Sequence, residues 1–425
     1  MKRPLLLLLA LAVVGLAALG VRRWSQRDAA AAPPAPRGWW NLAPDDAQPR
    51  SREALARELS LPYLAGVERA GAGRYGVRIW ERAAAQPGWN LYVSGHAPEA
   101  ILTAMDGTVL HRWGIPFARA FPGEKPTVDS GSFRRVKLLA NGNLLAIFQG
   151  TGLVELDPES RLLWRYDVPV FNDLWVEPDE RRILLLAKLA TRRPDLRTDG
   201  PLLEDFVVTL DGGGHELARA SLLAAFERSS YRQLMLPLGA TADAFHSNAI
   251  SVLGPGGSGA FAPGNLLVSF REIDTVATLA PDASRLLWAA RGPFRGQHSP
   301  LLLADGRLLL FDNRGGEKGA TRVATLDPKS GLTETYWSGP PGHRLRSAQA
   351  GACHLLSNGD LLVVESEHGT AYELEPQSRR VVWEFANPHR AGARAELVAM
   401  LFDLERLERP TPFLRSLAAG AAQSP

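Results

Sequence analysis

Short apolar runs rich in Leu and Val alternate with turn sequences from about residue 88 onward. Four of these runs directly follow, or begin one residue after, an Asn-Gly, Gly-Asn or Asp-Gly pair: Leu144–Phe148, Leu266–Phe270, Leu308–Phe311 and Leu361–Val364. Such pairs favour the tight turns that join antiparallel strands. A run of four to five apolar residues between turns predicts a buried strand, so this part of the chain is expected to be all-β.

Tryptophans recur at the ends of these modules, at Trp113, Trp164, Trp288, Trp337 and Trp383. The gaps of 51, 49 and 46 residues match the length of a four-stranded blade, and the gap of 124 residues fits two blades with insertions. A repeat of this length in a chain of strands predicts a six-bladed β-propeller, in which each blade buries its faces against its neighbours. We expect the tryptophans to pack between blades rather than to bind a ligand.

The N-terminus has the pattern of a targeting segment. Lys2 and Arg3 precede the apolar run Leu5–Leu19, and an Arg pair at 22–23 follows it. This pattern indicates a signal segment, either an uncleaved membrane anchor or a cleaved signal peptide with its cleavage site in the Ala run 29–32. The Arg pair on the far side of the apolar run favours the anchor.

The composition changes along the chain suggest five parts. An Ala/Pro-rich stretch reads as a linker, and short helices are expected over Ser51–Ser60 and Glu396–Leu407. The predicted parts are a signal segment at 1–24, the linker at 25–45, a helical or extended segment at 46–87, the propeller at 88–390, and a C-terminal helix and tail at 391–425.

Charge and cysteine content exclude some classes of protein. The net charge is only +3, and much of it lies in the N-terminal segment, so the chain has no basic stripe for nucleic acid. Its single cysteine, Cys353, rules out an intramolecular disulfide.

Histidines mark the starts of three successive modules. His246 and His298 each precede the apolar residues of a module's first strand, and His354 lies three residues further into the next module. First strands line the channel of a propeller, so these imidazoles are expected to converge there, which suits metal binding, acid–base work or covalent transfer. Arg314 follows in a turn of the His298 module, with Arg322 beyond it. A nearby guanidinium disfavours a divalent cation and favours an oxyanion.

The order of several motifs resembles the bacterial arylsulfate sulfotransferases over roughly residues 60–405. The motifs are Asp243-x-x-His246-x-Asn248, Gly264–Arg271, Gln297-His298, Asp312-Asn313 and Asn387-Pro388.

This resemblance implies a six-bladed periplasmic propeller that moves a sulfuryl group from a phenolic sulfate ester to an acceptor phenol. It implies a sulfohistidine intermediate and no nucleotide donor, metal or cofactor. The implied catalytic residues are His246, His298, Arg314 and His354, with His354 the candidate for the sulfated residue; the implied substrate-binding residues are Asn248, Asn313 and Arg322. Together with the N-terminal segment, it places the protein at the periplasmic face of the inner membrane, or in the periplasm.

Two other functions stay open. The chain suits a non-catalytic, membrane-anchored scaffold or ligand-binding propeller, whose partner would meet the insertion at 192–206 or the Gly-rich run at 255–259. Metal-dependent hydrolysis is disfavoured because no acidic residue stands directly beside the three histidines. The donor, the acceptor and the oligomeric state are not determined by the sequence.

Overall fold

The computed structural model describes residues 52, 64–71, 73, 75–236, 238 and 241–421. The chain divides into two units, Met1–Pro49 and Arg50–Pro425, and all the described residues belong to the second. The predicted signal segment, the linker and nearly all of the helix predicted over Ser51–Ser60 lie outside the described residues. Within the described part, no helix is both long enough and apolar enough to cross a membrane.

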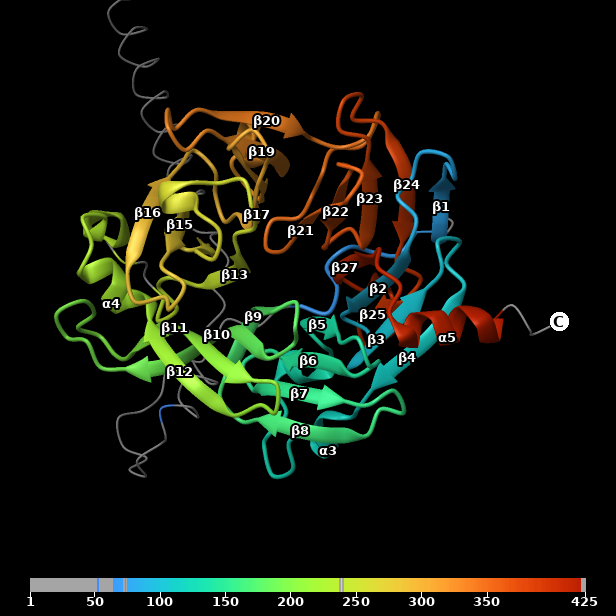
Figure 1. Ribbon diagram of the computed structural model, residues 1–425, viewed down its shortest axis with the longest axis horizontal. Helices are drawn as coiled ribbons and strands as arrows, with labels where there is room; N and C mark the ends of the chain where they lie inside the picture. Colours follow the sequence, from blue (N-terminus) through green and yellow to red (C-terminus); the bar gives the residue numbers. More distant parts are fainter. Residues whose placement is uncertain are drawn as a thin grey trace, which may run out of the picture. The chain divides into compact units, whose positions relative to one another are not determined.

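Six antiparallel sheets surround a central channel and form a six-bladed β-propeller (Figure 1). From the channel outward, the first three blades are β27 (Leu401–Leu407), β2 (Trp89–Ser94), β3 (Glu99–Thr103) and β4 (Val109–Gly114); β5 (Arg135–Leu138), β6 (Leu144–Phe148), β7 (Gly152–Leu156) and β8 (Leu162–Tyr166); and β9 (Val170–Val176), β10 (Arg182–Thr191), β11 (Leu202–Asp211) and β12 (Glu216–Ser221).

The second half of the ring repeats this arrangement. Its blades are β13 (Ser247–Val252), β14 (Leu266–Phe270), β15 (Thr275–Leu279) and β16 (Leu286–Arg291); β17 (His298–Leu302), β18 (Leu308–Asp312), β19 (Arg322–Leu326) and β20 (Thr333–Trp337); and β21 (Ala352–Leu355), β22 (Leu361–Glu365), β23 (Thr370–Leu374) and β24 (Val381–Ala386), with β1 (Gly76–Trp80) as a fifth, outer strand. The predicted insertion at 192–206 comprises the tip of a long hairpin and the start of its returning strand; in this hairpin β10 and β11 pair over ten residues each.

The C-terminal strand closes the ring. β27 pairs with β2 from Leu407 opposite Trp89 to Leu401 opposite Ser94, so the innermost strand of the first blade comes from the end of the chain. The helix predicted over Glu396–Leu407 is therefore wrong: this segment forms β26 (Leu397–Val398), which pairs with β25 (Arg390–Ala391), and then β27. Most of β27 is buried, so its apolar residues do not alternate with polar ones as they do in a half-exposed strand. Their spacing therefore resembles that of the apolar face of a helix.

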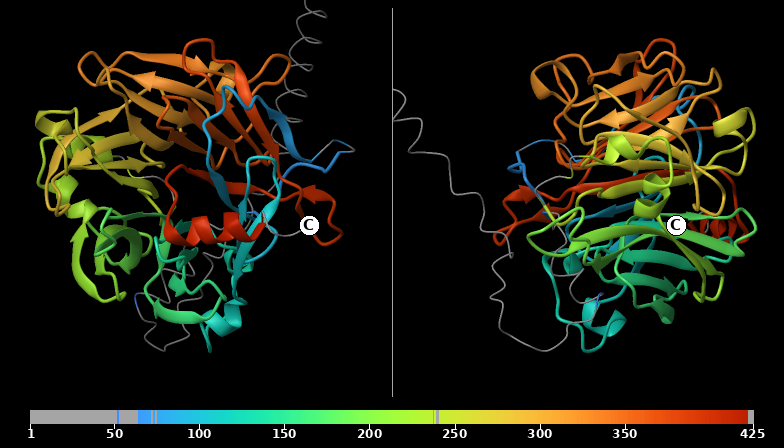
Figure 2. Two further views of the ribbon diagram at one scale, coloured as in Figure 1. Left: turned by 45° about the vertical axis from the view of Figure 1, so that its right-hand side comes forward. Right: turned by 90° about the vertical axis from the view of Figure 1, so that its left-hand side faces the viewer.

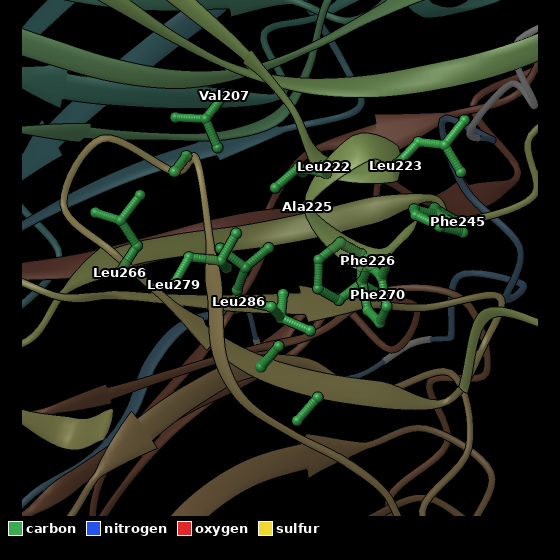
Figure 3. Close-up of a cluster of buried hydrophobic side chains, with 14 of the residues drawn as sticks. Val207, Leu222, Leu223, Ala225, Phe226, Phe245, Leu266, Phe270, Leu279 and Leu286 are labelled. Atoms are coloured by element: carbon green, nitrogen blue, oxygen red, sulfur yellow. The ribbon is translucent and has the colours of Figure 1, made fainter. Parts of the chain in front are cut away.

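In the described part of the chain, the helices are few and lie around the ring of sheets (Figures 1 and 2). They are α3 (Phe117–Ala120), α4 (Leu222–Glu227) and α5 (Pro412–Ala421), with short 3₁₀ turns at Val128–Gly131, Arg232–Met235, Gly259–Phe261 and Glu317–Gly319. The Ser221 hydroxyl accepts a hydrogen bond from the Ala224 N–H and caps α4. α4 packs its buried face on the third and fourth blades, where Phe226, Phe245 and Phe270 meet edge to face (Figure 3).

The tryptophans join neighbouring blades, which confirms the packing predicted for them. The indole N–H of Trp113 donates to the Gly142 carbonyl of the second blade at 3.1 Å, and that of Trp383 donates to the Met105 carbonyl of the first blade at 2.9 Å. Both side chains are fully buried. Each indole thus fills a space that a single blade leaves open and fixes the next blade against it.

Candidate active site at the channel mouth

The inner strands present the predicted histidines at different depths along the channel. Val252, Leu302 and Leu355 mark the same level in three blades, because each pairs with the first residue of the next strand of its blade. His246 precedes Val252 by six residues, and His298 precedes Leu302 by four. His354 precedes Leu355 by only one residue. A β-bulge lies between His298 and Leu301, and His298 pairs with Phe311, three residues into β18, whereas His354 pairs with Leu362, one residue into β22. A strand advances about 3.3 Å per residue, so His354 lies roughly 7 Å deeper than His298. The structure therefore brings His246 and His298 to the mouth and leaves His354 further in.

Hydrogen bonds determine which nitrogen of His298 carries the proton. Its Nδ1 lies 3.0 Å from the Gly296 carbonyl oxygen and 2.8 Å from Oδ1 of Asn313. Both partners accept, so Nδ1 carries the hydrogen and Nε2 has a free lone pair in the neutral ring. Nε2 is buried and has no hydrogen-bond partner among the described residues. A buried imidazole nitrogen without a partner is available to react with a ligand.

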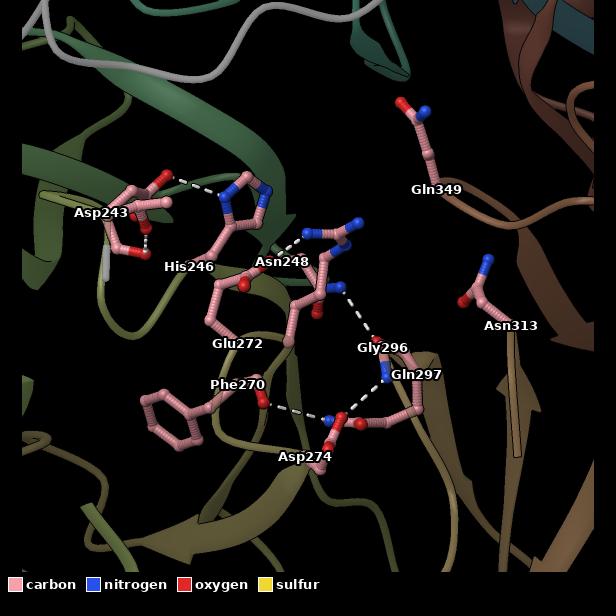
Figure 4. Close-up of polar contacts among 12 residues, drawn as sticks. Asp243, His246, Asn248, Phe270, Glu272, Asp274, Gly296, Gln297, Asn313 and Gln349 are labelled. Carbon is pink, nitrogen blue, oxygen red and sulfur yellow. Dashed lines mark hydrogen bonds and ion pairs between the residues drawn. The ribbon is translucent and has the colours of Figure 1, made fainter. Parts of the chain in front are cut away.

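Asn313 holds His298 and the adjoining loop in one arrangement. While its Oδ1 accepts from His298, its amide nitrogen donates to the Ser347 and Ala350 carbonyl oxygens at 2.6 and 2.8 Å. These two residues flank Gln349, which is exposed. Figure 4 shows the amides of Asn313 and Gln349 together with the His246 ring at this end of the channel. Gln349, rather than His354, is therefore the side chain that the last blade presents near the mouth.

A buried ion pair positions His246. Its Nδ1 lies 2.6 Å from Oδ2 of Asp243, and both oxygens of Asp243 lie within 2.8 Å of the Lys188 Nζ (Figure 4 for Asp243 and His246). All three side chains are nearly or fully buried. The carboxylate accepts, so Nδ1 of His246 carries the hydrogen and Nε2 is directed away from Asp243. Burial, followed by repulsion from Lys188, lowers the pKa of His246 to about 4 and keeps the ring neutral at pH 7.

Two arginines, Arg271 and Arg134, act on His298 at the mouth. The backbone N–H of Arg271, which follows β14, donates to the His246 carbonyl oxygen at 3.1 Å, and the guanidinium forms an ion pair with Glu272. Arg134 precedes β5 and is buried, with its guanidinium over the Phe402 ring. The pKa of His298 lies well below its usual value. Burial is the largest cause, and the charges of Arg271 and Arg134 lower the pKa further. Two neutral imidazoles beside two cations suit an anionic ligand.

His354 belongs to a separate charged network in the interior of the channel. Its Nε2 lies 2.7 Å from Oδ1 of Asp403, which also pairs with Arg135, and Lys137 lies 2.5 Å from Glu405. These side chains line a cavity of about 150 Å³. Because Nε2 of His354 is bonded to a carboxylate, His354 could react only through Nδ1, and it would do so inside this cavity rather than at the mouth.

The remaining predicted residues occupy three different environments. Asn248 is buried, and its amide donates to the Gln297 carbonyl oxygen at 2.8 Å, so it connects two inner strands directly beside His298. Arg314 is exposed, with its guanidinium close to Gly296. Arg322 lies away from the histidines, because its Nε donates to Asp312 at 2.8 Å and one of its terminal amino groups donates to the Thr335 hydroxyl. The geometry thus favours Asn248 as a residue of the site at the mouth. Arg322 instead stabilises its own blade through Asp312 and Thr335.

The sequence interpretation did not assign roles to four residues that shape the mouth: Arg134, Arg271, Gln349 and Lys188. Arg271 ends the motif Gly264–Arg271, which was its only signal in the sequence. Lys188 lies within an apolar strand and becomes significant only because β10 places it against Asp243. Arg134 and Gln349 lie in irregular segments outside any recognised motif.

Comparison with known proteins supports the resemblance over part of the chain. Residues 197–388 match the family model described as arylsulfotransferase (ASST), which spans the last three blades and their approach. No curated protein matches the sequence. Among solved structures, a protein of unknown function from Bacteroides caccae is 14% identical with a TM-score of 0.50, over 76% of this chain and 100% of that chain. A virginiamycin B lyase from Staphylococcus aureus is 12% identical with a TM-score of 0.35, over 60% of this chain and 69% of that chain. At 14% identity, the first of these shows the fold alone.

Proposed function

Because residues 197–388 match the arylsulfotransferase family, we propose that the protein transfers a sulfuryl group from an aryl sulfate ester to an acceptor phenol at the channel mouth. The observation that carries this proposal is the neutral, buried His298, whose Nε2 has no partner among the described residues and whose pKa is depressed in part by Arg271 and Arg134. A neutral imidazole attacks without first losing a proton.

The transfer proceeds in two displacements. First, Nε2 of His298 forms a bond to sulfur while the bond from sulfur to the aryl oxygen breaks, and the phenolate leaves with the electron pair. The oxygen of the acceptor phenol then attacks the same sulfur, and the N–S bond returns its pair to Nε2. The phenolic proton of the acceptor passes to Nε2 of His246 and from there to solvent, while the departed phenolate takes up a proton from solvent, so the products are a new aryl sulfate and a phenol.

The neighbouring charges support each step. Arg271 and Arg134 neutralise the sulfuryl oxygens, whose negative charge is held throughout the transfer. The Nδ1–H of His298 remains bonded to Asn313 and stabilises the positive charge that develops on the ring. His246 Nε2, which carries no hydrogen, accepts the proton of the acceptor phenol. A bound sulfate ester offsets the cations that lower the pKa of His246, so the ring becomes a stronger base when substrate is present.

This proposal assigns the sulfated nitrogen to His298 and not to His354. It also retains the periplasmic face of the inner membrane as the location, on the strength of the basic and apolar pattern of the N-terminus. An extracytoplasmic site has no access to nucleotide sulfate donors, which agrees with transfer between aryl esters.

The full-length protein tests the mechanism with 4-nitrophenyl sulfate as donor and phenol as acceptor. The wild-type protein releases 4-nitrophenolate and forms phenyl sulfate, whereas His298→Ala and His298→Gln lose about 10³-fold or more of the rate; the Gln variant keeps an N–H for Asn313. His354→Ala is the matched control and retains the rate within a few fold. Mass spectrometry of the protein incubated with donor alone locates the sulfate on the peptide that contains His298. A sulfated His354, full activity without His298, or no transfer by the wild-type protein refutes the assignment, and the last result favours a non-catalytic propeller.

A further inference from the structure

A second group of histidines lies on the rim of the last blade, outside the proposed catalytic site. His343 belongs to the connection between β20 and β21, Glu365 is the last residue of β22, and His368 lies in the turn that leads to β23. One potential ligand atom from each of these residues lies within 4.8 Å of the others. The two imidazole rings are 4.6 Å apart between centroids.

Glu365 gives this group a buried negative charge. Its side chain has no exposed surface, and its Oε2 lies 2.9 Å from Nε2 of His343. The Tyr372 hydroxyl donates to the same oxygen at 3.2 Å, and the Arg346 N–H donates to Oε1. These bonds fix the carboxylate with one face toward the two imidazoles. A carboxylate of this kind is a strong cation ligand, because burial removes competing water.

His368 is oriented from behind by a second carboxylate. Its Nδ1 lies 2.7 Å from Oε2 of Glu68, which leaves Nε2 of His368 for another partner. Glu68 is itself anchored, because the Val398 N–H donates to its backbone carbonyl at 2.9 Å. A carboxylate that holds the distal nitrogen of a histidine is the usual outer shell of a zinc ligand.

We propose that His343, Glu365 and His368 bind a divalent first-row transition-metal ion such as Zn²⁺, with Glu68 orienting His368. Two imidazoles and one carboxylate form a recognised ligand set for such ions and leave a position for water. Ligand atoms of a tetrahedral zinc site are about 3.3 Å apart. The atoms of His343 and Glu365 are already near that separation, and the ligand atom of His368 lies within 4.8 Å of both, so a small rotation of the His368 ring would complete the set. The two glutamates also balance the charge of the ion.

The other histidine group of this kind in the described part of the chain does not meet these conditions. His96, Glu99 and His389 have the same residue types and lie equally close. There, however, Arg112 donates to Glu99 at 2.9 Å and neutralises the carboxylate, while Ser94 and Glu99 engage both nitrogens of His96. This group is therefore a matched control with the same composition.

The metal has a structural consequence near the channel mouth. It joins the loop of His343 to the turn of Glu365 and His368. Within that turn, Glu367 accepts the Gln349 N–H at 2.7 Å. The ion thus ties together the two segments that present Gln349, independently of whether the site below catalyses sulfuryl transfer.

Zinc binding to the full-length protein, purified without a polyhistidine tag and dialysed against EDTA, tests the proposal. Titration against a chromophoric chelator is expected to show one zinc ion per chain, and Co²⁺ at the same site is expected to give visible ligand-field bands. The double variant His343→Ala/His368→Ala loses saturable binding. Glu68→Gln, which keeps both imidazoles, weakens zinc affinity by about 10- to 100-fold.

The control is His96→Ala/His389→Ala, which is expected to bind zinc as the wild-type protein does. Unfolding midpoints measured in EDTA show whether each variant is folded, and the single variant His343→Gln replaces the double variant if the latter is not. Absence of saturable zinc binding by the wild-type protein refutes the site, as does undiminished binding after loss of His343. Loss of binding only in the His96/His389 variant assigns the metal to the other group and equally overturns the proposal.

Discussion

His298 should make the protein less stable in mild acid, and the effect can be isolated in a variant. In the unfolded chain a histidine has a pKa of about 6.5. In the folded protein, burial and the charges of Arg271 and Arg134 hold the pKa of His298 well below that value. Below about pH 6.5 the unfolded state therefore binds a proton that the folded state does not, and the stability falls as the pH falls.

The size of the effect follows from this linkage. Each pH unit below the unfolded pKa costs about 1.4 kcal/mol for one such histidine, so His298 contributes a loss of about 2 kcal/mol between pH 7 and pH 5. Other groups act in the opposite direction. Burial, for example, raises the folded pKa of Asp205 to about 6, so this carboxyl binds a proton more readily in the folded state. The pH dependence of the wild-type free energy of unfolding therefore does not report on His298 alone. The difference in this free energy between the wild-type protein and a His298 variant is needed.

The variant His298→Gln supplies that difference. Urea unfolding followed by tryptophan fluorescence at pH 7, 6 and 5 gives the free energy of unfolding of both proteins. The advantage of the wild-type protein over the variant should shrink by about 2 kcal/mol from pH 7 to pH 5. Val268→Ala, a packing variant in β14 with no titrating group, should keep a constant difference. A constant difference for His298→Gln as well would show that the ring is not held neutral by its surroundings, and the argument for its free Nε2 would fail.

Three further changes test the contacts around the mouth. Arg271→Gln should lower kcat/KM for 4-nitrophenyl sulfate by about 10²–10³-fold, because it removes a cation beside the transferred group; an unchanged value would place the sulfuryl group elsewhere. Lys188→Met should lower the free energy of unfolding by about 3–5 kcal/mol, because it leaves the Asp243 carboxylate buried without its cation. Adding Asp243→Asn should restore part of that lost stability. If the double variant is no more stable than Lys188→Met alone, the ion-pair explanation is contradicted. Asn313→Ala should destabilise the protein by about 2–4 kcal/mol in urea unfolding, since two carbonyls and the His298 N–H lose a partner; a change under 1 kcal/mol would show that water replaces the amide.

The tryptophan repeat predicts the number of blades because the tryptophans at the module ends pack against the next blade. Trp113 and Trp383 both donate an indole hydrogen bond to the next blade, which explains why their spacing follows the blade length. The closing strand is less predictable, because its partner strand β2 lies about 300 residues earlier in the chain. Asp403 and Glu405 fix this strand against the next blade, because they pair with Arg135 and Lys137 of its inner strand β5.

The site is harder to predict than the fold because depth in the channel depends on register. In sequence, His246, His298 and His354 all stand near the starts of modules, and the three-residue displacement of His354 does not by itself show what that histidine contacts. The strand pairing shows the consequence, since His354 pairs two residues deeper than His298 and contacts Asp403 in the interior of the channel. The reactive character of His298 also comes from outside its own strand. Asn313 lies fifteen residues further along the chain, and its Oδ1, together with the Gly296 carbonyl, fixes the hydrogen on Nδ1 and so leaves Nε2 bare. A histidine pattern can therefore indicate which residues face a channel, whereas the choice of nucleophile depends on the hydrogen bonds that the fold supplies.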